Sequence, residues 1–209
     1  MARLIALALT LGALGCAGRP PCGACAEGAV CDLDGACRPL APREGLRFAR
    51  ALRLRPRDWG GSRRDAPGEP GRPFDELILG GAAEGRVYLA FDLPDGEVVS
   101  AVLRLTPAPR SAAAGERTLR AFRSTPFDGA WVRHRLRPAR LGRPTRGRRL
   151  RAVEGRPLYL DVTPLVRGRE GRVLFLGVEG RGGGRTPWRV ASPLAEDVRA
   201  QPRLDLRMR

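Results

Sequence analysis

The chain has 209 residues, with 38 basic and 22 acidic side chains, a formal net charge of +16, one histidine and five cysteines. This length predicts one compact domain with short appendages. Its 19 prolines and 27 glycines, with only 5% aromatic residues, argue against a helical bundle, a coiled coil and a polytopic membrane protein. Lysine and asparagine are absent, which is typical of a genome that avoids AT-rich codons, so the charge is weak support for a nucleic-acid partner.

The N-terminus carries the pattern of an export signal. Arg3 precedes an apolar run over residues 4–14, and the small residue Gly15 follows before Cys16. A mature helix needs about 20 apolar residues to span a bilayer, so this run is too short for one. We predict that residues 1–15 form a signal peptide that is removed during export.

The sequence Ala13-Leu14-Gly15-Cys16 resembles a bacterial lipobox, in which the cysteine is acylated and becomes the first residue of the mature protein. Ordinary cleavage after an Ala-x-Gly site would instead leave Cys16 as a spare thiol. Without Cys16 the chain keeps four cysteines, an even set suited to two disulfides in an oxidising compartment. We therefore expect lipidation of Cys16, a tether over residues 16–21, and a lipid-anchored protein of the bacterial cell envelope, at the outer membrane or the periplasmic face.

A cysteine-rich module is expected over residues 22–37, with the remaining cysteines at Cys22, Cys25, Cys31 and Cys37. Zinc sites usually pair two Cys-x-x-Cys knuckles or add histidines, whereas this segment has one knuckle and no histidine. Disulfides are therefore favoured, and we expect no metal and no cofactor. Of the connectivities open to the four cysteines, 22–31 with 25–37 is preferred, because Cys22 and Cys25 are too close in the chain to pair readily. Residues 38–45 are a predicted linker.

Residues 46–209 read as short apolar runs separated by turn signals. Apolar residues alternate over 87–93, the sequence Pro94-Asp95-Gly96 supplies a turn, and the alternation resumes over 99–105, which predicts a hairpin. Further strands are expected over 46–54, 76–79, 118–123, 131–136, 148–153, 157–162, 172–178, 188–191 and 203–207.

Two further patterns complete the predicted domain. Residues 173–178 are apolar on both faces of a strand, which predicts a central strand. Pro164 fits the first turn of a short helix over 163–166. The predicted fold class is an all-β, jelly-roll-like β-sandwich over 46–209, preceded by the small disulfide-rich module. We expect the sandwich to fold without that module, because a domain of this size buries enough surface to form its own core.

Three segments, in this order, resemble DNRLRE-type domains. The segment 86–105 is similar to the family's "FDL…sAtLrL" core, 158–166 to its "fDVTplV" segment, and 191–204 to its "aS.e…PrL" ending. The resemblance implies a jelly-roll-like sandwich of secreted bacterial proteins, members of which act as carbohydrate-binding modules. Residues 124–151 depart from the family, because only Phe127, Trp131 and a run of arginines stand where its Trp- and Asn-bearing loop is usual.

Little in the sequence points to catalysis. His134, the only histidine, lies among arginines and has no orienting carboxylate nearby, so a hydrolase triad is not expected. The carboxylate pairs Asp75–Glu76 and Glu196–Asp197 are neighbours in sequence, which point to opposite faces of a strand. Gly182-Gly183-Gly184 is read as a flexible connection rather than a phosphate cradle, because no helix with a Lys-Ser/Thr pair follows it.

Two groups of residues are candidates for ligand binding. Trp59, placed by the sequence in a polar, glycine-rich loop, and Trp131 could stack on the apolar face of a sugar ring. Residues 133–151 contain nine arginines and no acidic residue, and we single out Arg146, Arg148 and Arg149 as ligands for carboxylate, sulfate or phosphate groups. A solvated surface that reflects codon bias is the alternative for this run.

The sequence therefore favours a non-catalytic envelope lipoprotein whose β-sandwich binds glycan, with acidic polysaccharide as the leading partner. Its other expected partner is the membrane, through the lipid anchor; nucleic acid is not expected, because exported lipoproteins seldom meet it. A purely structural surface lipoprotein is the second hypothesis, and a polysaccharide-active enzyme is a distant third.

Overall fold

In the computed structural model, the described residues are 29–31, 37–39, 50–62, 76–82, 84–108, 111, 115–133, 137–153, 155–167 and 171–209. The predicted signal peptide, tether and Cys16 lie outside these residues, as do Cys22 and Cys25. The elements are β1 (Ala29–Cys31), β2 (Cys37–Pro39), β3 (Arg50–Leu54), β4 (Asp58–Ser62), β5 (Glu76–Leu79), β6 (Arg86–Asp92), β7 (Val98–Leu105), β8 (Glu116–Ser124), α1 (Gly129–Arg133), β9 (Arg140–Leu141), β10 (Arg148–Arg151), β11 (Leu158–Asp161), α2 (Thr163–Arg167), β12 (Val173–Arg181), β13 (Trp188–Ala191) and β14 (Arg203–Met208).

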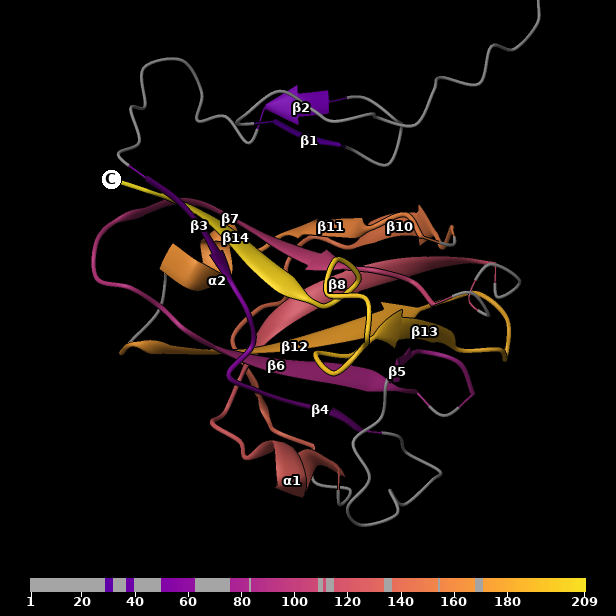
Figure 1. Cartoon of the computed structure of the whole chain (residues 1–209). Coiled ribbons are helices and arrows are strands. Elements are labelled where there is room, and N and C mark those ends of the chain that lie inside the picture. Colours follow the sequence, from indigo (N-terminus) through magenta and orange to yellow (C-terminus); the bar gives the residue numbers. More distant parts are fainter. Residues whose placement is uncertain are drawn as a thin grey trace, which may run out of the picture.

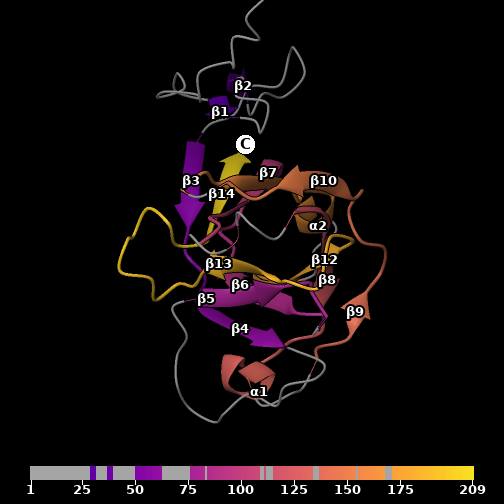
Figure 2. The same cartoon turned by 90° about the vertical axis from the view of Figure 1, so that its right-hand side faces the viewer.

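The main body is an all-β sandwich, as predicted (Figure 1). A six-stranded sheet has the order β10-β8-β12-β6-β4, with β9 also paired to β8, and a four-stranded sheet has the order β11-β7-β14-β3. All pairings between strands are antiparallel, and β5 pairs with β13 in a separate two-stranded sheet. Figure 2 shows β6 and β4 in one layer and β7, β14 and β3 in another, with α1 beyond β4 on the side away from the four-stranded sheet. The edge strand β10 of the six-stranded sheet curves toward the four-stranded sheet.

Alternating side chains from both sheets fill the core between the layers. Val87, Leu89 and Phe91 of β6 meet Leu103 and Leu206 of the other sheet in one buried cluster. These residues alternate along their strands with residues on the outer face, because successive strand side chains point to opposite sides. The central position predicted for residues 173–178 is confirmed, since β12 lies between β8 and β6.

The predicted hairpin between 87–93 and 99–105 is wrong. β6 pairs with β12 and β4, whereas β7 pairs with β11 and β14. The turn after β6 thus carries the chain from one sheet to the other. Alternation shows which face of a strand is buried but not which neighbour supplies its hydrogen bonds, so two strands on opposite sides of one core look like a hairpin.

One local prediction fails and another is confirmed. The expected strand over 131–136 is replaced at residues 131–133 by the end of α1, because the Asp128 side chain accepts a 2.7 Å hydrogen bond from the Ala130 N–H and starts a helix. The expected short helix is confirmed as α2, where the Asp161 carboxylate accepts a bond from the Thr163 N–H at 2.9 Å.

The cysteine-rich module contributes the hairpin of β1 and β2, in which Cys31 and Cys37 lie directly opposite each other. The preferred pairing of 22–31 with 25–37 stays a prediction, because its other two cysteines lie outside the described residues.

Candidate functional site

A pocket of about 490 Å³ opens where the C-terminal end of β12 meets the tip of the β5–β6 hairpin. Its walls come from that hairpin tip, from one residue at the start of β8, and from the glycine-rich stretch 179–185. Four arginines and two glutamates line it, namely Arg86, Arg117, Arg181, Arg185, Glu84 and Glu179. The lining thus carries an excess of two positive charges.

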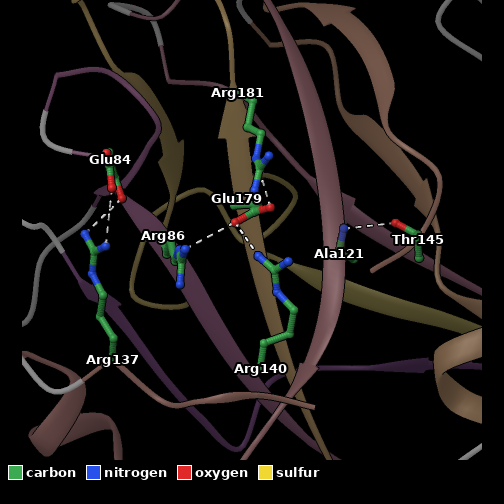
Figure 3. A network of polar contacts seen from close by, with 8 residues as sticks. All are labelled: Glu84, Arg86, Ala121, Arg137, Arg140, Thr145, Glu179 and Arg181. Carbon is green, nitrogen blue, oxygen red and sulfur yellow. Dashed lines mark hydrogen bonds and ion pairs between the residues drawn. The ribbon is translucent and has the colours of Figure 1, made fainter. Parts of the chain in front are cut away.

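Glu179 is the buried centre of the charge network at this pocket (Figure 3). Its side chain is only 6% exposed, and its Oε2 lies 2.8 Å from Nη2 of Arg140 and 3.4 Å from Nη2 of Arg86. Its Oε1 lies 3.3 Å from Nε of Arg181. One carboxylate is therefore ion-paired with three guanidinium groups, so its single negative charge balances only part of their positive charge.

The sheet register brings these groups together. Glu179 of β12 is the direct partner of Arg86 on β6, and the preceding pair, Val178 and Val87, is buried in the core, so Glu179 and Arg86 project from the outer face. Arg140 arrives from β9 on the far side of β8, and its guanidinium lies 4.8 Å from the ring centre of Phe122. This cation–π contact holds the arginine flat against the sheet as it reaches Glu179.

Arg117 forms the back of the pocket and holds the glycine loop. It is 2% exposed, and its guanidinium donates hydrogen bonds to the carbonyl oxygens of Gly182 at 2.5 Å, Gly184 at 2.7 Å and Thr186. Burial lowers the pKa of Arg117, yet an arginine in a protein keeps its charge. Its positive charge is therefore fixed behind the pocket wall and is met by carbonyl dipoles.

The glycine loop, which the sequence predicts to be a flexible connection, lines the pocket and is hydrogen-bonded to it. Gly182 and Gly183 both have a φ of +74°, a conformation that favours glycine, and a Cβ at Gly183 would come within 2.8 Å of the Glu116 carbonyl oxygen. The loop also accepts a 3.0 Å hydrogen bond from the Ala82 N–H at the Arg185 carbonyl. Both walls of the pocket are therefore tied to each other.

The second pocket glutamate has a looser environment. Glu84 is half exposed and its Oε2 lies 3.7 Å from Nη1 of Arg137, whose Nη2 also donates to the Glu84 carbonyl oxygen at 3.1 Å (Figure 3). Arg137 and Arg140 both belong to the arginine run of residues 133–151. Two members of that run therefore contribute to the pocket's ion pairs.

The chemistry that this lining offers is anion binding. Arg181 is 59% exposed on its side chain, and Arg185 is exposed with no ion-pair partner among the described residues. One buried donor of the lining, Nε of Arg117, has no hydrogen-bond partner within the described part of the chain, whereas Oε1 of Glu179 is ion-paired with Arg181. Guanidinium groups bind carboxylate and sulfate oxygens through paired hydrogen bonds, so the mouth of the pocket suits such anions.

The aromatic platform expected at Trp59 is wrong. The polar loop around it is strand β4, where Trp59 is 8% exposed and packs in the core beside Leu89, its partner on β6. On the outer face of the same sheet, Tyr88 and Phe122 are fully buried in a second apolar cluster with Val132 of α1. Tyr88 and Phe122 therefore pack beneath the helix and offer no surface for stacking.

The other predicted ligands are spread apart. Trp131 belongs to α1, and its side chain lies outside the described part of the structure. Arg148 and Arg149 are neighbours on β10 and thus point to opposite faces, and Nε of Arg149 is 2.6 Å from Oε2 of Glu116. Arg146 is exposed in the segment before that strand. The structure does not gather these three arginines into one site.

The pocket residues Arg86, Arg117, Arg181 and Arg185 were missed by the sequence analysis. Each is a single arginine that precedes or follows a predicted strand, and such an arginine on its own is interpreted as a solvated surface residue. The one available signal was the glycine triplet at 182–184 flanked by two arginines. Glycines with adjacent cationic groups mark a position where backbone and ligand can approach closely.

Metal binding and membrane spanning find no support within the described residues. They contain no group of three or more His, Cys, Asp or Glu side chains placed to hold a metal ion. They also contain no helix long and apolar enough to cross a bilayer. His134 lies outside them. Neither a family model nor a curated protein matches this chain, so the similarity to DNRLRE-type domains stays a prediction.

Proposed function

We propose that the protein is a non-catalytic lipoprotein of the bacterial cell envelope whose β-sandwich binds an acidic polysaccharide through the arginine-lined pocket. The excess of positive charge around Glu179 carries this proposal. Arg181 and Arg185 at the mouth would meet the carboxylate or sulfate groups of the polymer. Arg86 and Arg117 supply fixed positive charge behind them.

The charged lining favours an acidic over a neutral glycan. Neutral sugars are usually held by exposed aromatic rings, and no aromatic residue is among the described residues that line the pocket. Carboxylate and sulfate groups instead pair with guanidinium groups, whose hydrogen bonds to charged partners are each worth about 1.5–3 kcal/mol. Acidic polysaccharide is also abundant where an exported lipoprotein resides.

The membrane anchor is a separate part of the proposal and rests on Cys16. Acylation of this cysteine would hold the sandwich at the membrane, since two or more acyl chains make a stable anchor. Intact-mass measurement of the mature protein tests it. A chain that begins at Cys16 and carries the mass of the acyl groups supports the anchor, whereas a chain that begins at Ala17 or has an unmodified Cys16 contradicts it.

Calorimetric titration of the purified protein tests the pocket. The probes are polygalacturonate for carboxylates, dextran sulfate for sulfate esters, and dextran as the neutral polymer with the same backbone as dextran sulfate. We expect binding to one or both acidic polymers and none to dextran. Affinity should fall between about 0.05 and 0.5 M salt, because exposed charges are screened over about 10 Å at 0.1 M.

Matched double variants locate the binding. Arg181→Gln with Arg185→Gln removes two charges at the mouth and should weaken affinity at least tenfold, about 1.4 kcal/mol. Arg57→Gln with Arg172→Gln removes the same charge from exposed ion pairs with Asp92 and Asp95, at the opposite end of β6 and β12. Equal effects of both variants would mean that only net charge matters, and the pocket assignment would fail.

The alternative of a purely structural lipoprotein predicts no polymer binding by any of these proteins. An enzyme would need free carboxyl groups for acid and base roles. Here Glu179 is engaged by three guanidinium groups and Glu84 by Arg137. We therefore propose that both glutamates position arginine side chains and are not catalytic residues.

A further inference from the structure

A second strongly charged surface covers the outer face of the four-stranded sheet. On β14, Leu204 and Leu206 lie in the core, so Arg203, Asp205 and Arg207 belong to the opposite face. We call this surface the Asp205 face; it consists of Arg53, Arg104, Tyr159, Arg203 and Asp205, and Arg207 is buried on the same side at 6% exposure.

The strand register sets this face in rows. Tyr159 of β11 is opposite Arg104 of β7, which in turn is opposite Arg203 of β14. In the next row Asp205 is opposite Arg53 of β3, and Nε of that arginine lies 3.6 Å from Oδ1 of Asp205. An aromatic ring and two cationic side chains thus stand side by side across three strands.

The positive charges of this face exceed its negative ones. Asp205 has four arginines within electrostatic reach, and Asp161 at the β11 edge is the other carboxylate on this side. Like charges directly opposite each other on adjacent strands are destabilising, which is the arrangement of Arg104 and Arg203. Burial and the neighbouring arginines lower the pKa of Arg203. An anion placed between these arginines would relieve their repulsion.

Unpartnered donors are present at the same place. The Nε atoms of Arg104 and Arg203 are buried and have no hydrogen-bond partner among the described residues. Tyr159 is half buried beside Arg104, and its ring can lie against the apolar face of a sugar while the arginines bind an acidic substituent. Arg53, whose side chain is 76% exposed, extends the cationic surface toward the β3 edge.

From this geometry we infer that the Asp205 face is a second binding site for acidic polysaccharide and that the protein cross-links such chains. The inference rests on the proposed function of the pocket. The pocket residues Arg86 and Glu179 project from the outer face of the six-stranded sheet, and the Asp205 face is the outer face of the four-stranded sheet. Strands β6 and β4 of the first sheet and β14 and β3 of the second lie in different layers (Figures 1 and 2). The buried core lies between the pocket and the Asp205 face, so the two sites would bind different polymer segments.

Light scattering of mixtures with polygalacturonate tests the cross-linking. The protein alone must be monodisperse, so that any network arises through the polymer. With wild-type protein we expect scattering to rise with added polymer and to fall again at polymer excess, where each site occupies a separate chain. Calorimetry should show that wild-type protein binds about twice as many polymer segments per molecule as a variant that keeps only one of the two sites.

The key variant is Arg104→Gln with Arg203→Gln, which should keep pocket binding within about twofold of wild type but lose the cross-linking. Arg53→Gln is a second variant whose exposed side chain leaves the core untouched, and it should reduce cross-linking at least threefold. Thermal unfolding of each variant checks that it is folded. Arg57→Gln with Arg172→Gln again serves as the charge-matched control and should cross-link like wild type.

The outcomes separate this inference from the proposed function. If the pocket variant Arg181→Gln with Arg185→Gln abolishes all binding, or if both face variants cross-link like wild type, the second site is refuted while the pocket stands. If the pocket variant binds like wild type and only the Arg104→Gln, Arg203→Gln protein loses binding, the pocket assignment fails and the Asp205 face is the sole site. In that case cross-linking through two sites is also refuted.

Discussion

Replacing Glu179 by glutamine should make the protein less stable and a tighter binder of acidic polymer. The substitution keeps the size of the side chain and an acceptor for Arg140, but it removes the one negative charge shared by three guanidinium groups. Those groups then repel one another without a counter-charge, which lowers stability. The same loss makes the pocket more positive, which strengthens anion binding.

The magnitudes follow from burial and distance. Removing one partner of a fully buried ion pair costs about 3–5 kcal/mol. The side chains of Arg86, Arg140 and Arg181 are 25%, 28% and 59% exposed, so water recovers part of the loss. We expect a cost of about 2–3 kcal/mol, or roughly 4–12 °C in Tm for a domain of this size. One unit charge about 4 Å from an anion in water is worth about 1 kcal/mol, which is roughly fivefold in affinity.

Urea unfolding and titration with polygalacturonate at low salt measure the two effects on the same preparations. Glu84→Gln is the control, because Glu84 lines the same pocket but its side chain is 54% exposed, and an exposed pair is worth at most about 1 kcal/mol. Wild-type stability of the Glu179→Gln protein would refute the role of Glu179 as a counter-charge. Weaker polymer binding would mean that the carboxylate contacts the ligand itself.

Three further predictions concern the core, the outer face and pH. Phe91→Ala should cost about 3–5 kcal/mol in chemical unfolding, because Phe91 is fully buried in the central cluster; a stable variant would contradict that placement. Gly177→Ala should cost about 1–3 kcal/mol, since the new Cβ would come within 2.2 Å of the Phe122 ring, and a neutral effect would show that the ring moves freely. Burial raises the pKa of Asp205 above 3.8, so the folded protein binds this proton more tightly than the unfolded chain does. Lowering the pH from neutral toward that value should therefore stabilise wild type relative to Asp205→Asn. Urea titrations in which the unfolding free energy of wild type minus that of Asp205→Asn stays constant or falls as the pH is lowered would oppose this.

Strand positions followed from the sequence where one face is buried against a core and the other is polar. The strands at Glu76–Leu79 and Trp188–Ala191 have the predicted bounds, because each is a short, mainly apolar run between turn signals. β4 was missed because Gly60 and Gly61 read as a loop. In the structure only glycine fits at position 60, because a Cβ there would come within 2.8 Å of the Val132 side chain of α1.

The site was harder to predict because its parts are distant in sequence and close only in the folded sheet. Glu179 lies at the end of an apolar run, and its partners come from β6, β9 and the end of β12. A local run of arginines was the visible signal, yet strand alternation divides Arg148 from Arg149 and sends them to opposite faces. Charge pairing across strands depends on register, which composition and spacing do not determine.

Hydrogen–deuterium exchange of the purified protein, with and without saturating polygalacturonate, tests most directly whether the pocket binds acidic polysaccharide. The glycine loop at 182–186 is exposed, so its amides exchange readily unless a ligand covers them. We predict slower exchange on binding in that loop and at the hairpin tip of residues 80–86, and no change at the distant turn of residues 94–97. Polymer binding that leaves exchange in the loop and the hairpin tip unaltered would contradict the account.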